Sequence, residues 1–426
     1  MESRRSTYDR RVIKWRRPVA AAALASVPML LAACQVAGTP QRGPLDVDTG
    51  EFVTTLSDPG SLPAADDPYQ AGLRLADAVV FRQEVESIVD KPGPSDALGS
   101  TSQLDALGYF APGIGQDTEA RASEQRSSKD FRFGYRSISY TGTERSGDAA
   151  ERSDRKHLSV AVLRYTDPEA AQAAVTELAE VADENAHTPG VEVKKGAAGL
   201  PNGGKGMLAV IDSTKFTEEI ALVPRGRDVV VVQVAAQGDA AAERWRAETV
   251  RTAVDRQLAR LEQDDVPDAD APRSADETDL LIRTVPLNAE ASPVPGQNYI
   301  SGTRAVAHLY FDAPGTEQAL IEAGVDMVSI RATTVYRAAD AAKAEGLQEY
   351  FDEFIAEADS SHVRTSSPQD LSSTSCWDTG EAAGAGSTRY YCLLAHDRYL
   401  IWVTANEDLT LAHQAVAAQY TLLDAE

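Results

Sequence analysis

Cysteine is scarce in this chain, with three residues among 426, at positions 34, 376 and 392. So few cysteines exclude the disulfide-dense scaffolds of small secreted domains. No C-x-x-C redox motif is present, and two cysteines without a matched pair of histidines do not make a zinc site. We therefore expect neither a bound metal nor a cofactor.

Recognisable catalytic motifs are also missing. The six histidines are scattered, and none belongs to H-E-x-x-H or another metal-binding spacing. The nucleophile elbow G-x-S-x-G does not occur, so a serine hydrolase of the α/β type has no visible nucleophile. Residues 199–205 match G-x-x-x-x-G-K, but Gly206 stands where a P-loop needs Ser or Thr, and a strand-like run follows. We interpret this stretch as a glycine-rich turn and assign no catalytic residue.

Positive charge is in deficit, with 41 basic against 65 acidic residues and a net charge of −24. Residues 1–33 hold seven basic and two acidic residues, so the chain without them carries −29. A charge of this sign opposes binding to nucleic acid, which needs a basic surface. It also opposes simple electrostatic docking on anionic lipid, and it favours solubility at an envelope surface.

The N-terminal apolar stretch, from Pro18 to Leu31, is shorter than the roughly 20 residues that cross a bilayer. It follows a basic region, as the apolar part of a secretory signal does. It ends in Leu31-Ala32-Ala33-Cys34, which resembles the bacterial lipobox. In that type of signal the cysteine receives a diacylglyceryl group, and the peptide is cut just before it.

The lipobox resemblance implies that the mature chain begins at lipid-modified Cys34. The protein would then be exported and held by this anchor at the outer face of the cell membrane. The alternative is a free cysteine that follows small residues by chance. The export route stays open, because the residues after Arg10-Arg11 match the twin-arginine pattern only loosely.

The remaining cysteines, Cys376 and Cys392, are an even pair in a chain expected to be exported. Their midpoint is Gly384, inside the glycine-rich stretch GEAAGAGS. Residues equally distant from a hairpin turn face each other across the two strands. We therefore expect a hairpin closed by a Cys376–Cys392 disulfide.

Composition shifts divide the chain into five segments. Prolines and glycines without periodicity predict a tether, and an acidic stretch with prolines (QDDVPDADAPRSADET) predicts a linker. Around them, alternating strands and amphipathic helices predict folded lobes. We expect a signal peptide (1–33), a flexible tether (34–68), a first lobe (69–262), an acidic linker (263–279) and a second lobe (280–426).

The two lobes share a pattern. LRYTDPEAA (163–171) aligns with YRAADAAKA (336–344) at an offset of 173, so Asp167 meets Asp340 as a helix cap. RGRDVVVVQV (225–234) aligns with HDRYLIWVTA (396–405) at an offset of 171. These offsets predict an α+β fold of two tandem related lobes, each an antiparallel sheet with helices packed on one face. Two unrelated α+β domains are the alternative.

Two other local patterns carry expectations. The run AVAHLYF (305–311) predicts an apolar strand in which His308 is a packed or edge residue rather than a catalytic base. Five aromatic residues fall on adjacent expected strands. They form either one packed sheet face or a flat stacking surface for glycan or lipid. They are Trp377, Tyr390, Tyr391, Tyr399 and Trp402.

Several of these features together resemble an uncharacterised lipoprotein family of mycolic-acid-bearing actinobacteria. The features are the lipobox, the tether, TVYRAADAA (334–342), the cysteines around a hairpin and the closing AAQYTLL (417–423). The resemblance implies an envelope location and a two-lobed α+β body. It implies no activity, so no catalytic or ligand-binding residue is carried over from it.

We therefore expect a membrane-anchored, non-enzymatic envelope protein that binds a lipid, a glycan or a protein. The alternative is an envelope hydrolase or transferase without a recognisable motif. A deep apolar cavity between sheet and helices would favour the binder. A cleft with a Ser or Asp beside a His or carboxylate of perturbed pKa would favour the enzyme.

Overall fold

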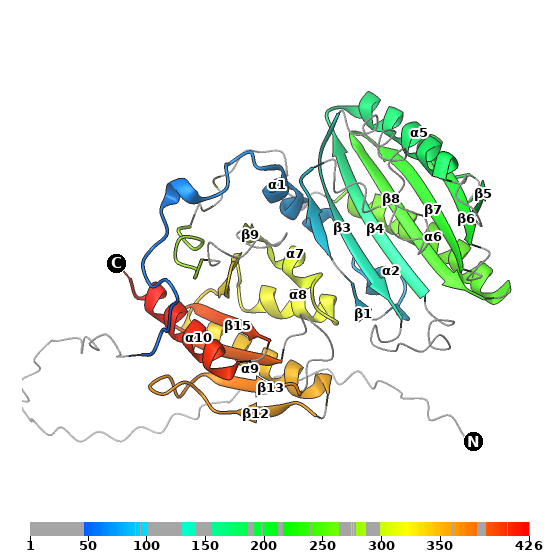
Figure 1. The fold of residues 1–426 in the computed structure, drawn as a ribbon. Coiled ribbons are helices and arrows are strands. Elements are labelled where there is room, and N and C mark those ends of the chain that lie inside the picture. The colour runs from blue at the N-terminus through cyan, green and yellow to red at the C-terminus, as the bar shows by residue number, and fades with distance from the viewer. Residues whose placement is uncertain are drawn as a thin grey trace, which may run out of the picture. The chain divides into compact units, whose positions relative to one another are not determined.

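The computed structural model describes sixteen stretches of the chain. They are 47–89, 91–93, 95–100, 130–141, 156–185, 191–196, 199–211, 216–238, 240–263, 274, 276, 278–286, 299–359, 361–380, 389–406 and 408–425. The chain from Leu45 onward forms one compact unit, which contains two antiparallel sheets (Figure 1). Cys34 and the expected signal peptide lie outside the described residues.

The first sheet has the strand order β1-β3-β4-β8-β7-β6-β5, and β2 pairs with β3 beside β1. Its strands are β1 (Lys91–Pro92), β2 (Asp96–Leu98), β3 (Phe131–Tyr140), β4 (Lys156–Tyr165), β5 (Val191–Lys195), β6 (Lys205–Ile211), β7 (Phe216–Arg225) and β8 (Asp228–Gln237). The helices of this lobe are α1 (Pro68–Leu75), α2 (Arg82–Val85), α5 (Pro168–Asn185) and α6 (Ala240–Arg260). Short 3-10 helices occupy Pro59–Ser61, Ala76–Ala78 and Pro201–Gly203.

The second sheet has the strand order β12-β13-β14-β15-β11-β10-β9. Its strands are β9 (Tyr299–Ser301), β10 (Met327–Ile330), β11 (Thr334–Arg337), β12 (Val363–Thr365), β13 (Ser375–Asp378), β14 (Tyr390–His396) and β15 (Tyr399–Ala405). The helices are α7 (Thr303–Ala307), α8 (Ala313–Glu322), α9 (Ala341–Ala358) and α10 (Leu409–Leu423). No helix in the described part of the chain combines the length and the apolar character needed to cross a bilayer.

The two lobes have the same topology. The path β3-β4-β8-β7-β6-β5 in the first sheet corresponds to β10-β11-β15-β14-β13-β12 in the second. In each lobe one long helix, α5 or α9, follows the second strand of this path, and another, α6 or α10, follows the last strand in sequence. The α+β class and the tandem arrangement of related lobes expected from the sequence are therefore confirmed.

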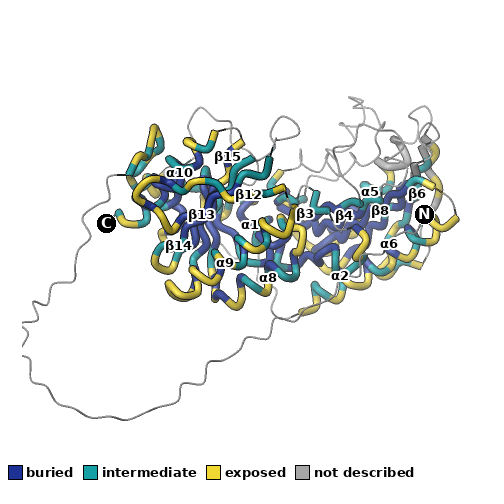
Figure 2. The backbone as a smooth tube through the Cα atoms, turned by 90° about the horizontal axis from the view of Figure 1, so that it is seen from below, coloured by how far each residue is buried: buried dark blue, intermediate teal, exposed yellow. Residues whose placement is uncertain are grey.

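The helices cover both faces of each sheet, which differs from the expectation of one covered face. Val229 and Val231 of β8 belong to the core under α5, whereas Val230, Val232 and Val234 belong to the core under α6. Figure 2 shows the buried strands β4 and β8 between these two helices. A run of consecutive valines is the expected pattern for a strand buried on both faces, because neighbouring side chains point in opposite directions.

The second sheet is covered in the same way. The core on one face contains Leu347 and Phe351 of α9 with Leu393 and Trp402 of the sheet. The core on the other face contains residues of α10 packed on the disulfide hairpin and on β15. The buried residues of this second core are Leu371, Cys376, Cys392, Leu394, Ile401, Val403, Ala405, Ala412, Ala415, Val416 and Ala417.

Equivalent positions of the two lobes carry equivalent local structure. The carboxylate of Asp167 accepts a hydrogen bond from the backbone N–H of Ala170 at 2.8 Å, and that of Asp340 accepts one from Lys343 at 2.9 Å. Both aspartates therefore cap a long helix, as the offset of 173 predicts. The tight turns that follow β7 and β14 both begin with a left-handed residue, Gly226 in the first lobe and Asp397 in the second.

The segment expected to be an apolar strand over 305–311 is helical instead. Residues 305–307 belong to α7 and residues 308–311 form a turn, and the backbone N–H of His308 donates to the carbonyl of Arg304 at 3.2 Å, one helical turn earlier. Four consecutive buried residues, from Arg304 to Ala307, are compatible with either a strand or a short helix buried on all sides. The periodicity of so short a run does not separate the two.

Part of the stretch expected to be a flexible tether packs against the second lobe. Phe52 lies against the α10 core, and Leu56 packs with Val285 and Leu422. The backbone N–H of Ser57 donates to the carbonyl of Ile282 at 3.1 Å. From residue 47 onward, this segment is therefore held to the second lobe along the described chain.

The segment from α1 to α2 connects the two lobes. The guanidinium of Arg304, in the second lobe, lies 3.8 Å from the centre of the Phe81 ring and forms an ion pair with Glu84 at 2.8 Å. The amide of Gln70 on α1 donates to the carbonyl of Ile300 on β9 at 2.6 Å. A charge-assisted ion pair and a buried hydrogen bond together give the lobe contact a defined geometry.

Candidate ligand pocket

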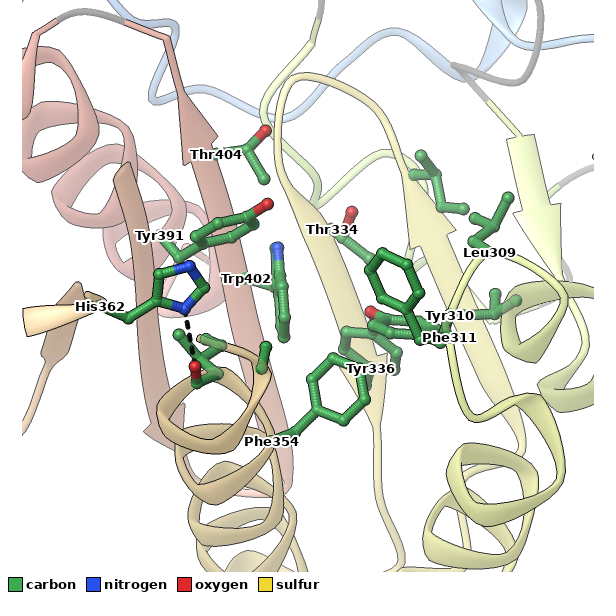
Figure 3. Close-up of a pocket in the computed structure, with 14 residues that line it drawn as sticks. Leu309, Tyr310, Phe311, Thr334, Tyr336, Phe354, His362, Tyr391, Trp402 and Thr404 are labelled. Atoms are coloured by element: carbon green, nitrogen blue, oxygen red, sulfur yellow. Dashed lines mark hydrogen bonds between the residues drawn. The ribbon is translucent and has the colours of Figure 1, made fainter. Parts of the chain in front are cut away.

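A cavity of about 330 Å³ lies in the second lobe, between the sheet, the C-terminal part of α9 and the segment after α7 (Figure 3). Its lining is mostly apolar and rich in aromatic rings. The lining residues are Val306, Leu309, Tyr310, Phe311, Ile330, Thr334, Tyr336, Phe354, Ile355, Ala358, His362, Tyr391, Trp402 and Thr404. Pockets that hold small apolar ligands have this composition, and this one is at the lower end of their volume range.

Strand register brings the sheet residues of the pocket together. Thr334 on β11 pairs directly with Trp402 on β15, and Tyr391 on β14 pairs directly with Thr404. Trp402 and Thr404 are two residues apart, so their side chains point to the same face of the sheet. The four side chains therefore line one end of that face, where β14 and β11 begin and β15 nears its last residue.

Aromatic contacts fix the indole of Trp402 in the pocket wall. Its ring lies 4.9 Å from that of Phe351 and 5.6 Å from that of Tyr391, at interplanar angles of 80° and 76°. The ring of Tyr310 lies 5.9 Å away at 83°. Edge-to-face pairs of this type contribute about 0.5–1.5 kcal/mol each beyond the area that they bury. The wall is therefore formed before any ligand arrives.

Two tyrosine hydroxyls form a hydrogen bond with each other beneath the pocket. The hydroxyls of Tyr310 and Tyr336 lie 2.5 Å apart. Burial raises the pKa of both phenols above the ordinary value of 10, so neither ionises near neutral pH. This pairing places no charge in the pocket and leaves the floor apolar in character.

His362 enters the pocket from the loop after α9. Its Nδ1 donates to the backbone carbonyl of Ile355 at 2.8 Å, since a carbonyl oxygen only accepts. That bond fixes the orientation of the ring, and Figure 3 shows it between the end of α9 and Tyr391. The second ring nitrogen, Nε2, is left to interact with a pocket occupant.

Large hydrophobic side chains are exposed at the rim of the pocket. Leu309 is 48% exposed and Phe311 is 50% exposed. Arg82 holds this rim segment by donating to the backbone carbonyls of Tyr310 and Phe311. The Lys91 ammonium of β1 lies 5.2 Å from the centre of the Phe311 ring. Exposed apolar groups beside an apolar cavity are typical of a binding site.

The five aromatic residues singled out from the sequence divide between the two faces of the sheet. Tyr391 and Trp402 line the pocket. Trp377 shares their face, but its indole N–H donates to Asp352 and its ring is covered by Arg364. Tyr390 belongs to the opposite core, and Tyr399 is an even number of residues from the buried Ile401 and Val403 of that core. They therefore form no continuous stacking surface.

Sequence reasoning missed most of the other pocket residues. Tyr310 and Phe311 fall in the stretch predicted to be a strand, and that prediction gave them no role in a pocket. The available signal was the density of aromatic residues around Tyr310 and in α9, where Tyr350, Phe351 and Phe354 fall within one and a half turns. Nothing in that local pattern shows that these segments meet on the same sheet face.

Cys376 and Cys392 pair directly across β13 and β14, and a disulfide joins them. The register centres this hairpin on Gly384, which lies outside the described residues. A nitrogen of His413 lies within 4.8 Å of both sulfurs. Because the sulfurs are bonded to each other, they are not thiolates and this group does not form a metal site.

Ser137 and His308 form a hydroxyl–imidazole pair at the lobe contact, with Oγ and Nδ1 3.1 Å apart. Both residues are buried, and the rings of Phe81 and Tyr135 pack on the imidazole at 4.6 and 5.3 Å. Burial lowers the pKa of His308 to about 3. A hydrolase that used this pair would need the lobes to separate, so the pair is a packed hydrogen bond in this structure.

Two family models match the chain, one over each lobe. The model described as Domain of unknown function (DUF7373) N-terminal matches residues 64–272, and the model described as DUF7373 C-terminal matches residues 280–426. The chain belongs to the DUF7373 family. The two DUF7373 matches separate the two sheets, because every strand of the first sheet precedes residue 272 and every strand of the second follows residue 280.

Comparisons with curated proteins and with solved structures were also made for this DUF7373 chain. No curated protein matches its sequence. Among solved structures, the extracellular domain of PknH from Mycobacterium tuberculosis is similar to part of it, with 14% sequence identity and a TM-score of 0.29. The similarity covers 44% of this chain and 96% of the PknH chain.

Proposed function

We propose that this chain is an exported, lipid-anchored protein of the cell envelope that binds an apolar ligand in the second-lobe pocket. The observation that carries the proposal is the aromatic cavity of about 330 Å³ between the sheet and α9. The cavity is bounded by packed rings, and its rim exposes Leu309 and Phe311. An apolar ligand would remove this surface from water, at about 25 cal/mol per Å² of area buried.

A lipid is favoured over a glycan or a protein as the envelope ligand. A sugar stacks on the open face of an aromatic ring, but the indole of Trp402 is surrounded edge-to-face by Tyr310, Phe351 and Tyr391. A protein partner needs an interface much larger than a cavity of this volume. An acyl chain or another slender apolar group fits a narrow space walled by rings.

The lipobox-like sequence that ends at Cys34 supports the envelope location in this proposal. Two acyl chains hold a protein at a membrane durably, whereas a single chain holds it only marginally. A tethered binding module also has a high effective concentration near its target. The resemblance to lipoproteins of mycolic-acid-bearing actinobacteria points to the same compartment, where lipids are abundant.

Filling the pocket mouth should abolish ligand binding. Ala358 ends α9, is exposed and lines the cavity, so Ala358→Trp would place an indole in the mouth without disturbing the core. The probe is N-phenyl-1-naphthylamine, an uncharged dye that fluoresces in apolar surroundings. We expect at least about a tenfold loss of dye affinity, which corresponds to about 1.4 kcal/mol.

The matched control is Ala356→Trp, because Ala356 lies on the same helix, is exposed and does not line the cavity. All chains should carry Cys34→Ala, so that no acyl group takes up the dye. Equal dye binding by the two tryptophan variants, or no saturable binding by the unsubstituted chain, would contradict the proposal. Far-UV circular dichroism shows whether each variant is folded.

A further inference from the structure

We infer that the pocket's ligand is an uncharged amphiphile whose hydroxyl-bearing head sits at Thr334, Trp402 and Thr404. Its apolar part would lie against the aromatic and aliphatic walls. This inference rests on the proposed function and adds to it the chemical class of the ligand and its orientation. It follows from three properties of the lining: a polar edge, the absence of carboxylate, ammonium and guanidinium groups, and an apolar remainder.

The polar edge is a product of strand register. Thr334 and Trp402 face each other across β11 and β15, and Thr404 follows two residues later on the same face. Figure 3 shows the indole nitrogen of Trp402 turned toward the side of the pocket where Thr404 lies. Two hydroxyls and one indole N–H therefore lie along one edge of the cavity.

These groups have hydrogen-bonding capacity to spare. Among the described residues, none hydrogen-bonds to the hydroxyl of Thr334, which is half-buried, to that of Thr404, which is exposed, or to the indole N–H of Trp402. An indole N–H donates only, whereas a hydroxyl both donates and accepts. A ligand hydroxyl could accept from Trp402 and exchange a second hydrogen bond with a threonine, so it matches the edge better than an acceptor alone.

Apart from the imidazole of His362, whose Nδ1 is bonded to the carbonyl of Ile355, the lining offers no charged partner to an ionised head group. None of the fourteen lining residues is Asp, Glu, Lys or Arg. The Lys91 ammonium lies at the rim over the ring of Phe311, not among the polar edge residues. A charged group placed in such surroundings without a partner loses hydration that the protein does not replace. An uncharged head avoids this cost.

The remaining walls suit an apolar chain. Phe354 and Ile355 of α9 face the cavity from one side, and Leu309 and Phe311 form the exposed rim. A chain that starts at the polar edge would pass over these side chains. The exposed rim allows a chain longer than the cavity to continue out of it.

A series of ten-carbon ligands tests the class of head group. Decanol, decanoate and decyltrimethylammonium have alkyl chains of nearly equal length, and at neutral pH their heads are uncharged, anionic and cationic. Each is titrated against dye bound to the full chain carrying Cys34→Ala. We expect decanol to displace the dye at a concentration about tenfold lower than either ion, because the polar edge offers hydroxyls and an indole N–H but no carboxylate, ammonium or guanidinium partner.

Removing the two hydroxyls tests the orientation. The double variant Thr334→Val and Thr404→Val keeps the side-chain shape and should weaken decanol binding about threefold to tenfold, the effect of one lost hydrogen bond. The loss of decanol affinity should exceed any change in affinity for the dye, which carries no hydroxyl. Thr252→Val on α6 is the matched control, and it should leave decanol binding unaltered.

The outcomes separate the two proposals. The inference would be overturned if decanoate or decyltrimethylammonium displaced the dye as strongly as decanol does. If the affinity for decanoate then depended on Lys91, the ligand would be identified as anionic. Unchanged decanol affinity in the double valine variant would also overturn it. Absence of dye binding in every chain would instead contradict the proposed function.

Discussion

At the scale of single residues, His308 shows how the lobe contact controls a titratable group. The imidazole is fully enclosed at the contact between the lobes. Burial, together with the nearby cations Arg304 and Arg82, lowers its pKa from 6.5 to about 3. The folded chain therefore keeps His308 uncharged over a pH range in which an unfolded chain would protonate it.

We expect acid to destabilise the chain through this residue. Between pH 6.5 and about 3, the unfolded state binds a proton that the folded state excludes, so the unfolding free energy falls as the pH falls. The contribution is up to about 1.4 kcal/mol per pH unit. His308→Asn should make this pH dependence shallower, as measured by urea unfolding at a series of pH values. An identical slope in the variant would assign the acid sensitivity to other groups.

Residue-level reasoning from the sequence reached only part of the pocket. Tyr391 and Trp402 stood out because both fall on strands that flank a tight turn, and both line the cavity. Thr334 could not be recognised from the sequence, because it lines the pocket only as a result of its pairing with Trp402 across β11 and β15. That register joins residues nearly seventy positions apart, and no local pattern encodes it.

At the scale of elements, the repeated helix caps are the part of the fold that the sequence predicts best. Asp340 begins α9 as Asp167 begins α5, and each carboxylate accepts from a backbone N–H in the first turn. The sequence does not predict as well which helix packs on which face of a strand. Both faces of β8 carry valine, and the sequence alone does not say which helix covers which face.

Loss of a cap should weaken the lobe that contains it. Asp340→Ala removes the acceptor for the backbone N–H of Lys343 and should lower the unfolding free energy by about 1 kcal/mol. Asp340→Asn keeps a side-chain oxygen at the cap and should lose much less. Urea unfolding of the three chains measures the difference. Equal losses for Ala and Asn would show that the effect does not come from capping.

At the scale of the whole molecule, one topology occurs twice with different chemistry. The register of the second hairpin pairs Cys376 with Cys392, and the equivalent pair in the first lobe is Gly206 with Ala221. The lobe that contains the pocket is thus also the lobe with the covalent cross-link. A disulfide stabilises a lobe mainly by restricting its unfolded chain, by about 3 kcal/mol for a loop of this length.

The anchor is a property of the whole molecule that one substitution tests. Cys34→Ala removes the thiol that would carry the diacylglyceryl group. If the proposed acyl chains hold the protein at the membrane, the variant should leave the membrane fraction. Fractionation of cells followed by immunoblotting measures the distribution. Continued retention of the variant in the membrane fraction would mean that something other than Cys34 holds the protein there.

Phe52 and Leu56 pack against the α10 side of the second lobe, and Asp48 accepts a hydrogen bond from Gln414 on α10 at 3.0 Å. Any tension applied to the amino-terminal end of the chain would therefore be borne first by these contacts. The lobe that contains the pocket would take the mechanical load before the first lobe does. In the proposed anchored state, movement of the anchor would thus reach the pocket lobe first, and the first lobe would follow through the lobe contacts of Gln70, Arg82 and Arg304.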